Sequence, residues 1–177
     1  MLNKHMQITK DVQRKLLREY FFIKGKINID CNYFKEKMKI GFDENENLNY
    51  RTNVKGKMTS FKFFVNDKKF QKMVGEFNMY IDKYQNFHPY GIQDAWGFTT
   101  EPGEGTVPHD HLCLWSGVVY LNKCDQPLVF KEIDEQVDPE EGSFALFSPW
   151  LLHGCEPNTD TVVKWGMSFN MGERKSW

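Results

Sequence analysis

From residue 91 onward the chain is a succession of short apolar runs separated by turn signals, and this rhythm constrains the fold more than any other feature. The runs are rich in β-branched and aromatic residues, which favour strands. They read IQDAWGFTT, HLCLWSGVVYLN, PLVFKEI, GSFALFS, WLLHGCE and TVVKWGMSFNM, and EPGEG, KCDQP, DPEEG and EPNTD punctuate them. Such a series predicts an all-β sandwich or barrel of the jelly-roll kind.

The segment before residue 91 is predicted to support that barrel with helices and a strand. Val12, Leu16, Leu17 and Tyr20 recur at helical spacing among charged residues, and the stretch YFFIKGKINI that follows reads as a strand. The polar stretch at 43–57 reads as a loop.

Two further helices are predicted in this segment, each with an acidic or amide cap. Asp30 can cap a short helix that carries Phe34 and Met38. The clearest helix covers 66–84, where Asn66 or Asp67 can cap, and its apolar stripe is suited to cover one face of a sheet. That stripe consists of Phe70, Met73, Val74, Phe77 and Ile81.

The length of 177 residues fits one domain, with a support region at 1–90 and a jelly-roll core at 91–172. The 15 Phe, 7 Tyr and 5 Trp must supply much of the core, which suits a β-rich architecture better than a helical bundle. The predicted fold class is therefore mainly β with flanking N-terminal helices.

Charge and cysteine usage limit the classes of function. With 23 Lys+Arg against 24 Asp+Glu, no global field attracts nucleic acid or anionic lipid, and no apolar stretch has the length of a membrane span. Cys31, Cys113, Cys124 and Cys155 form no CxxC pair and follow no secretory leader, so reduced thiols in a cytoplasm are expected. Lys- and Asn-rich usage is typical of an AT-rich genome, and for a viral protein that cytoplasm is the host's.

The stretch VPHDHLCLWSGVVYLN places His109 and His111 two residues apart, and on a strand both would point to the same side. With His153 they could hold a divalent iron on one face and leave other positions open, although the usual facial triad has two histidines and one carboxylate. Two histidines in a turn are also commonly just solvated polar residues. A local bulge would let Asp110 replace His111 as a ligand.

Four motifs in order, PHDH, SGVVYLN, EEGSFALFSPWLLH and KWGMSFN, resemble those of the iron(II)- and 2-oxoglutarate-dependent oxygenases, in particular the prolyl-hydroxylase-like and phage and bacterial branches. The resemblance covers roughly residues 92–171. It implies a double-stranded β-helix of the jelly-roll or cupin kind. It also implies a hydroxylase that uses Fe(II) and dioxygen, and that couples decarboxylation of 2-oxoglutarate to succinate with hydroxylation of a substrate.

The resemblance assigns roles to single positions. His109 and His153 match the iron-binding histidines, and His111 stands where many members have the carboxylate. Lys164 stands where most have the arginine that pairs with the distal carboxylate of 2-oxoglutarate, and Tyr120 matches a tyrosine that can hydrogen-bond the same group. Ser168 would share a face with Lys164 and help to bind the cosubstrate.

Two departures from the family pattern keep other functions open. Gly166 stands where the family commonly has a serine, and three neutral imidazoles would leave the metal its full double charge. Three-histidine iron sites also serve thiol dioxygenases of the cupin class, which need no cosubstrate, so a cosubstrate-free dioxygenase is one alternative. A non-catalytic jelly-roll binding protein is the other.

The substrate is not predicted beyond a small molecule or a peptide. Loops at 43–57 and 100–107 are expected to build its pocket, and a prolyl side chain is the nearest analogy. Trp96 is expected to serve packing rather than substrate contact. Because barrels of this family often pair through N-terminal helices, a homodimer is compatible with the resemblance.

Overall fold

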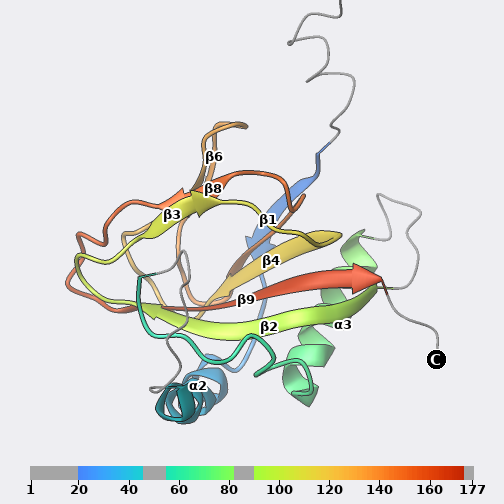
Figure 1. Cartoon of the computed structure of the whole chain (residues 1–177), viewed down its shortest axis with the longest axis horizontal. Coiled ribbons are helices and arrows are strands. Elements are labelled where there is room, and N and C mark those ends of the chain that lie inside the picture. Colours follow the sequence, from blue (N-terminus) through green and yellow to red (C-terminus); the bar gives the residue numbers. More distant parts are fainter. Residues whose placement is uncertain (1–19, 46–54, 82–89, 174–177) are drawn as a thin grey trace, which may run out of the picture.

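Two antiparallel sheets face each other, and two helices cover the outer side of the larger one (Figure 1). The computed structural model describes residues 20–45, 55–81 and 90–173. Its helices are α2 (Cys31–Asn45) and α3 (Lys68–Ile81). Its strands are β1 (Phe22–Lys26), β2 (Tyr90–Thr100), β3 (Thr106–His109), β4 (Trp115–Tyr120), β5 (Leu128–Phe130), β6 (Glu135–Val137), β7 (Ser143–Phe147), β8 (His153–Cys155) and β9 (Lys164–Glu173).

The larger sheet has the order β1-β7-β4-β9-β2 and the smaller sheet the order β3-β8-β5-β6. All the pairings are antiparallel, and most neighbours in space are distant in sequence, as in β4 with β9 and β3 with β8. The predicted mainly β architecture with flanking helices is confirmed.

Both helices begin at the predicted aspartate caps. The Asp30 carboxylate accepts a hydrogen bond from the amide of Tyr33 at 3.0 Å, and the Asp67 carboxylate accepts one from the amide of Phe70 at 3.0 Å. Each bond satisfies a backbone N–H group that has no partner inside the first turn of its helix.

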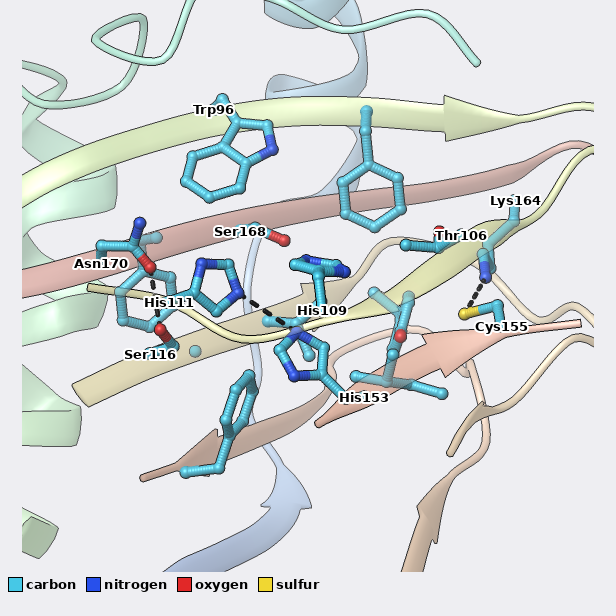
Figure 2. A pocket seen from close by; sticks show the side chains of 17 residues that line it. Trp96, Thr106, His109, His111, Ser116, His153, Cys155, Lys164, Ser168 and Asn170 are labelled. Atoms are coloured by element: carbon cyan, nitrogen blue, oxygen red, sulfur yellow. Dashed lines mark hydrogen bonds between the residues drawn. The ribbon is translucent and has the colours of Figure 1, made fainter. Parts of the chain in front are cut away.

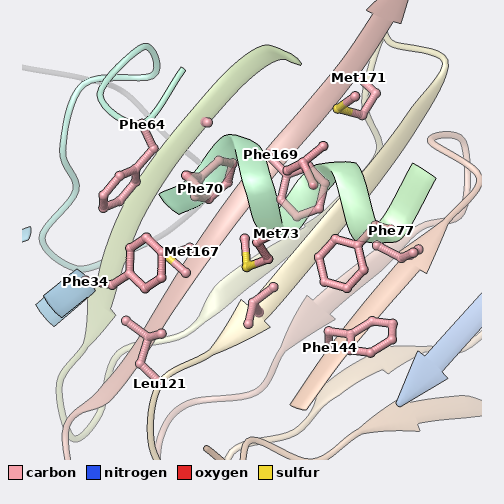
Figure 3. Close-up of a cluster of buried hydrophobic side chains, with 14 of the residues drawn as sticks. Phe34, Phe64, Phe70, Met73, Phe77, Leu121, Phe144, Met167, Phe169 and Met171 are labelled. Carbon is pink, nitrogen blue, oxygen red and sulfur yellow. The ribbon is translucent and has the colours of Figure 1, made fainter. Parts of the chain in front are cut away.

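The first hydrophobic core lies between the helices and the larger sheet (Figure 3). The stripe predicted on α3 faces β9 and β7, since the ring of Phe70 lies 5.6 Å from that of Phe169 and the ring of Phe77 lies 4.7 Å from that of Phe144. Burial of a Phe side chain stabilises a fold by about 1.5–3 kcal/mol, so this stripe fixes α3 firmly against the sheet.

The second hydrophobic core lies between the two sheets and borders the functional site. Phe130 of β5 and Phe147 of β7 pack edge to face at 4.9 Å, and the ring of His153 lies 4.7 Å from that of Phe147. These packed rings leave the His153 imidazole little freedom to turn away.

The strand predictions hold for six elements and miss two short ones. The predicted runs overlap β2, β4, β5, β7, β8 and β9, whereas β3 and β6 lie in the stretches between those runs. The strand predicted in YFFIKGKINI is confirmed as β1. The helix predicted around Val12 and residues 46–54 of the predicted 43–57 loop lie outside the described residues, and the loop prediction is wrong for 43–45, which belong to α2.

The four cysteines are free thiols in this structure. Within the described ranges 20–45, 55–81 and 90–173, no helix has the length and apolar character needed to cross a membrane.

Candidate metal centre

Three histidines that are distant in sequence meet at one end of the smaller sheet (Figure 2). His109 is the last residue of β3 and His153 the first of β8, and the two are paired across these antiparallel strands. His111 completes the cluster, and one ring nitrogen of each histidine lies within 4.8 Å of the others.

His111 reaches the cluster by a different route from the one predicted. The strand β3 ends at His109, so regular alternation along one strand does not bring the two side chains together, and this part of the prediction is wrong. Instead the backbone N–H of His111 donates to the carbonyl oxygen of Pro149 at 2.8 Å, which anchors the turn beside β8. Asp110 is exposed and is not a member of the cluster.

Backbone carbonyls fix the tautomers of two of the histidines. Nδ1–H of His109 donates to the Val107 oxygen at 2.9 Å, and Nδ1–H of His153 donates to the Leu151 oxygen at 2.8 Å. A carbonyl can only accept, so the proton must sit on Nδ1 and the lone pair on Nε2. Hydrogen bonds of this kind orient the histidine ligands of metal sites.

The third histidine shares its Nε2 with His153. The two Nε2 atoms are 3.2 Å apart, and because that of His153 carries no proton, His111 must donate to it when no metal is bound. Two nitrogens bound about 2.1 Å from one metal at a right angle would be roughly 3 Å apart. The observed spacing therefore fits a shared cation, with His111 then in its other tautomer.

Burial keeps two of these imidazoles neutral. Burial, together with the nearby His109, lowers the pKa of His111 from 6.5 to about 4. Burial also lowers the pKa of His153 from 6.5 to about 3. Neutral imidazole is the form that binds metal, so at neutral pH the cluster needs no deprotonation of these two rings before a cation enters.

A buried cation, Lys164, lies at the other end of the same pocket (Figure 2). Its side chain is 1% exposed, and its Nζ donates to the Gln126 carbonyl oxygen at 3.3 Å and to Sγ of Cys155 at 3.3 Å. No ion pair between described residues includes Lys164. A buried ammonium group without a carboxylate is costly, which points to an anionic ligand.

Tyr120 lies next to this cation, with the centre of its ring 5.7 Å from the Lys164 Nζ. Burial raises the pKa of Tyr120 well above its ordinary value, and the neighbouring Cys155 and Cys124 act in the same direction. The phenol therefore keeps its proton at neutral pH and can donate a hydrogen bond into the pocket that it lines.

The pocket brings together all six residues singled out from the sequence. His109, His111, His153, Tyr120, Lys164 and Ser168 line it, with apolar walls that include Phe98, Val118, Leu128 and Phe147. Trp96, expected to serve packing, is buried and also forms part of the wall.

Sequence reasoning missed Ser116 and Asn170, two neighbouring polar residues, among the lining of this pocket. Ser116 donates from Oγ to Oδ1 of Asn170 at 2.8 Å beside His111 (Figure 2). Lys164, Ser168 and Asn170 are separated by even numbers of residues on β9, so extending the alternation from Lys164 would have found Asn170.

Packing explains the glycine at position 166. A Cβ at Gly166 would come within 2.4 Å of Cζ of Phe98, on the neighbouring strand β2. A serine could stand at this position only if the Phe98 ring moved, so glycine at position 166 fits the aromatic wall that Phe98 forms.

Comparison with solved structures identifies the architecture. The viral collagen prolyl hydroxylase of Paramecium Bursaria Chlorella virus-1, solved as a 2OG complex, superimposes with a TM-score of 0.68 and 15% identity, over 89% of this chain and 98% of that one. A prolyl-4-hydroxylase of Pseudomonas putida superimposes with a TM-score of 0.66 and 12% identity, over 87% and 93%.

The chain has the fold of the iron- and 2-oxoglutarate-dependent oxygenases. The predicted double-stranded β-helix is thereby confirmed. HygX from Streptomyces hygroscopicus, solved with nickel and 2-oxoglutarate bound, shares this oxygenase fold at a TM-score of 0.59 and 11% identity, over 94% of this chain and 87% of that one. Neither a search of protein-family models nor a search of curated protein sequences finds a match.

Proposed function

We propose that this chain is an iron(II)- and 2-oxoglutarate-dependent dioxygenase that hydroxylates its substrate, with His109, His111 and His153 as the iron ligands. The observation that carries the proposal is the pairing, in one pocket, of a three-histidine cluster with a buried lysine that has no carboxylate partner among the described residues. The oxygenase fold supports the same conclusion.

Lys164 and Tyr120 would bind the carboxylate of 2-oxoglutarate that lies away from the iron. The cosubstrate is a dianion, so its distal carboxylate offsets the buried ammonium charge and accepts a hydrogen bond from the neutral phenol. A lysine supplies this charge at a single point, without the two parallel hydrogen bonds of an arginine. Ser168, midway along the pocket on β9, offers a further polar contact.

A metal ion held by the three histidines would keep its full positive charge, which favours binding of the 2-oxoglutarate dianion. Three neutral imidazoles offset none of the charge of Fe(II), whereas a carboxylate at position 111 would offset one unit. Bound iron would supply the centre at which dioxygen is reduced while 2-oxoglutarate loses carbon dioxide and becomes succinate. The protein contributes ligand orientation through the Val107 and Leu151 carbonyls and an apolar wall that excludes water.

The pocket end lined by Trp96, Ser116 and Asn170 is left for the substrate. Its side chains are neutral and include hydrogen-bond donors and acceptors, which suits an amide or hydroxyl group on either a peptide or a small molecule.

Iron-dependent formation of succinate from 2-oxoglutarate tests the proposal. We expect purified, iron-loaded protein to produce succinate slowly without substrate, and we expect the His153→Ala variant to produce none. Absence of both turnover and 2-oxoglutarate binding in folded, iron-loaded protein would refute the proposal. Iron binding without any response to 2-oxoglutarate would instead favour the cosubstrate-free three-histidine dioxygenase, for which the imidazole at His111 is the supporting observation.

A further inference from the structure

Cys155 and Lys164 are in contact beside the histidine cluster, and the proposed function gives the thiol no task. Sγ of Cys155 lies 3.3 Å from Nζ of Lys164 (Figure 2). Cys155 is the last residue of β8, and it lines both the histidine pocket and an outer cavity next to Pro108 and Glu156. Cys155 thus contributes to the walls of two cavities.

Nothing in the described surroundings holds the lysine nitrogen away from this sulfur. The remaining hydrogen bond of Nζ goes to a neutral acceptor, the Gln126 carbonyl oxygen at 3.3 Å. The residues Cys155 and Lys164 are 8% and 1% exposed, so only a molecule small enough to enter one of the two cavities meets them. A nucleophilic amine in van der Waals contact with a thiol is the arrangement in which an oxidised sulfur is captured by nitrogen rather than by a second thiol.

The other thiols have different neighbours. Sγ of Cys113 lies near Ser116 and the Trp115 carbonyl oxygen, and Sγ of Cys124 lies 3.6 Å from Oδ1 of Asn158. Among the hydrogen bonds of the described residues, the thiol–amine contact belongs to Cys155.

We propose that Cys155 and Lys164 form a covalent sulfur–nitrogen bond when the protein meets hydrogen peroxide. In the first step the thiol is oxidised by two electrons to a sulfenic acid, Sγ–OH, and the peroxide is reduced to water. In the second step the Lys164 ammonium first gives up one H⁺, and the lone pair of the resulting amine Nζ attacks Sγ. The S–O bond breaks, and the departing hydroxide takes a second proton from the nitrogen and leaves as water. The product is a neutral sulfenamide, which two equivalents of an external thiol reduce back to the free cysteine and the free amine.

This bond would switch off binding of the anion in the pocket. The cross-linked nitrogen carries no positive charge and is tethered to β8, so it can no longer pair with a carboxylate. This consequence rests on the proposed function, whereas the formation of the bond does not.

Peptide mapping tests the bond directly in the metal-free protein. After treatment with a small excess of hydrogen peroxide, the protein is cleaved before its aspartates, and cleavage before Asp160 separates Cys155 from Lys164. We expect the peptide 138–159 to remain joined to the peptide that begins at Asp160, with a mass lower than their sum by two hydrogen atoms. Dithiothreitol should separate the two peptides.

Two variants serve as controls. Cys155→Ser should abolish the joined species, and Lys164→Arg, which keeps the charge but lacks a nucleophilic amine, should leave a sulfenic acid at Cys155 that a 1,3-diketone reagent traps. Separate peptides in the oxidised wild-type protein, or a disulfide from Cys155 to Cys124 in their place, would overturn the proposal.

A binding measurement distinguishes this proposal from the function on which its consequence rests. We expect peroxide treatment of the protein, followed by loading with Fe(II), to weaken its binding of 2-oxoglutarate at least tenfold. Dithiothreitol should restore the affinity. If the peptides are joined but the reduced, iron-loaded protein never binds 2-oxoglutarate, the proposed function fails and the cross-link stands. If 2-oxoglutarate binds and no joined peptides form, the cross-link proposal fails and the proposed function stands.

Discussion

Nε2 of His111 lies 3.2 Å from Nε2 of His153, although 42 positions separate the two residues in the chain. The contact exists because the amide of His111 is bound to the Pro149 carbonyl, which precedes β8, while His153 opens that strand. This contact brings the two Nε2 atoms together in a buried place. Two facing nitrogen lone pairs repel each other there unless a proton or a cation lies between them.

Substitution of the cluster tests whether that cation is a metal ion. We expect His111→Ala to weaken binding of Fe(II) or Mn(II) by roughly tenfold or more, since a ligand is lost from a site of three. We expect His111→Asp to retain the metal, because a carboxylate restores the usual triad of two histidines and one carboxylate. Calorimetric titration of the metal-free protein with Mn(II) measures both.

Asp110→Asn is the matched control for the cluster variants. Asp110 is exposed beside His111 and lies outside the cluster, so its loss should change the metal affinity less than about twofold. A large loss of affinity in Asp110→Asn, with His111→Ala unaffected, would show that the carboxylate and not the imidazole is the ligand.

Removal of the buried cation should separate stability from binding. In Lys164→Met the uncompensated buried charge disappears, so the melting temperature without ligand should stay the same or rise. The affinity for 2-oxoglutarate should fall by roughly 100-fold, or about 3 kcal/mol, because a buried charge pair is lost. Calorimetry on the metal-loaded protein and thermal unfolding of the metal-free protein measure the two effects.

Lys131→Met controls for the general loss of a positive charge. Lys131 is largely exposed and lies at the outer cavity on the other side of Cys155. We expect it to leave the affinity for 2-oxoglutarate unchanged. An equal loss in both variants would remove the specific role of Lys164.

The sequence predicted which residues form the site better than it predicted the backbone structure that brings them together. Alternation along a strand correctly suggested that Lys164 and Ser168 share one face, since a single regular strand, β9, carries both. The same rule failed between His109 and His111, because β3 is four residues long and ends at the first histidine. The hydrogen bond to the Pro149 carbonyl, which replaces the strand, is a long-range contact with no local signature in the sequence.

The glycine at position 166 makes a packing prediction. Gly166→Ser should destabilise the fold by about 1–3 kcal/mol, because the new side chain would overlap the Phe98 ring. Chemical denaturation measures this cost. In a Phe98→Ala background the added cost of Gly166→Ser should be smaller, and equal costs in both backgrounds would exclude the Phe98 contact as the cause.

Asp67 should make the free energy of unfolding depend on pH in the acidic range. Burial alone would raise its pKa, but hydrogen bonds from Lys37, Tyr33 and the Phe70 amide outweigh this and lower it below 3.8. A folded-state pKa below the unfolded-state value adds stability above pH 3.8, and that stability is lost as the pH falls through the folded-state pKa. Asp67→Asn should therefore cost about 1–3 kcal/mol at pH 7 and progressively less in acid.

Urea unfolding of the two proteins at neutral pH and in acid checks this sign. A difference between wild type and Asp67→Asn that stays constant, or grows, as the pH falls below 3.8 would contradict it. Lys39→Met, which loses a surface pair with Glu36, should show no such dependence because both side chains are exposed.

The helix stripe was predictable, whereas the sheet order was not. Phe70 and Phe77 are two helical turns apart, and this spacing alone predicts that they share a buried face. The order β1-β7-β4-β9-β2 joins strands from both halves of the chain, and only the complementary faces of the folded sheets decide it.

Binding of 2-oxoglutarate to the iron-loaded protein under anaerobic conditions tests the central claim most directly. We predict a saturable visible charge-transfer absorption at one equivalent of 2-oxoglutarate, absent in His153→Ala and reached only at much higher concentration in Lys164→Met. Folded protein that holds iron but neither develops this absorption nor binds 2-oxoglutarate by calorimetry would contradict the account.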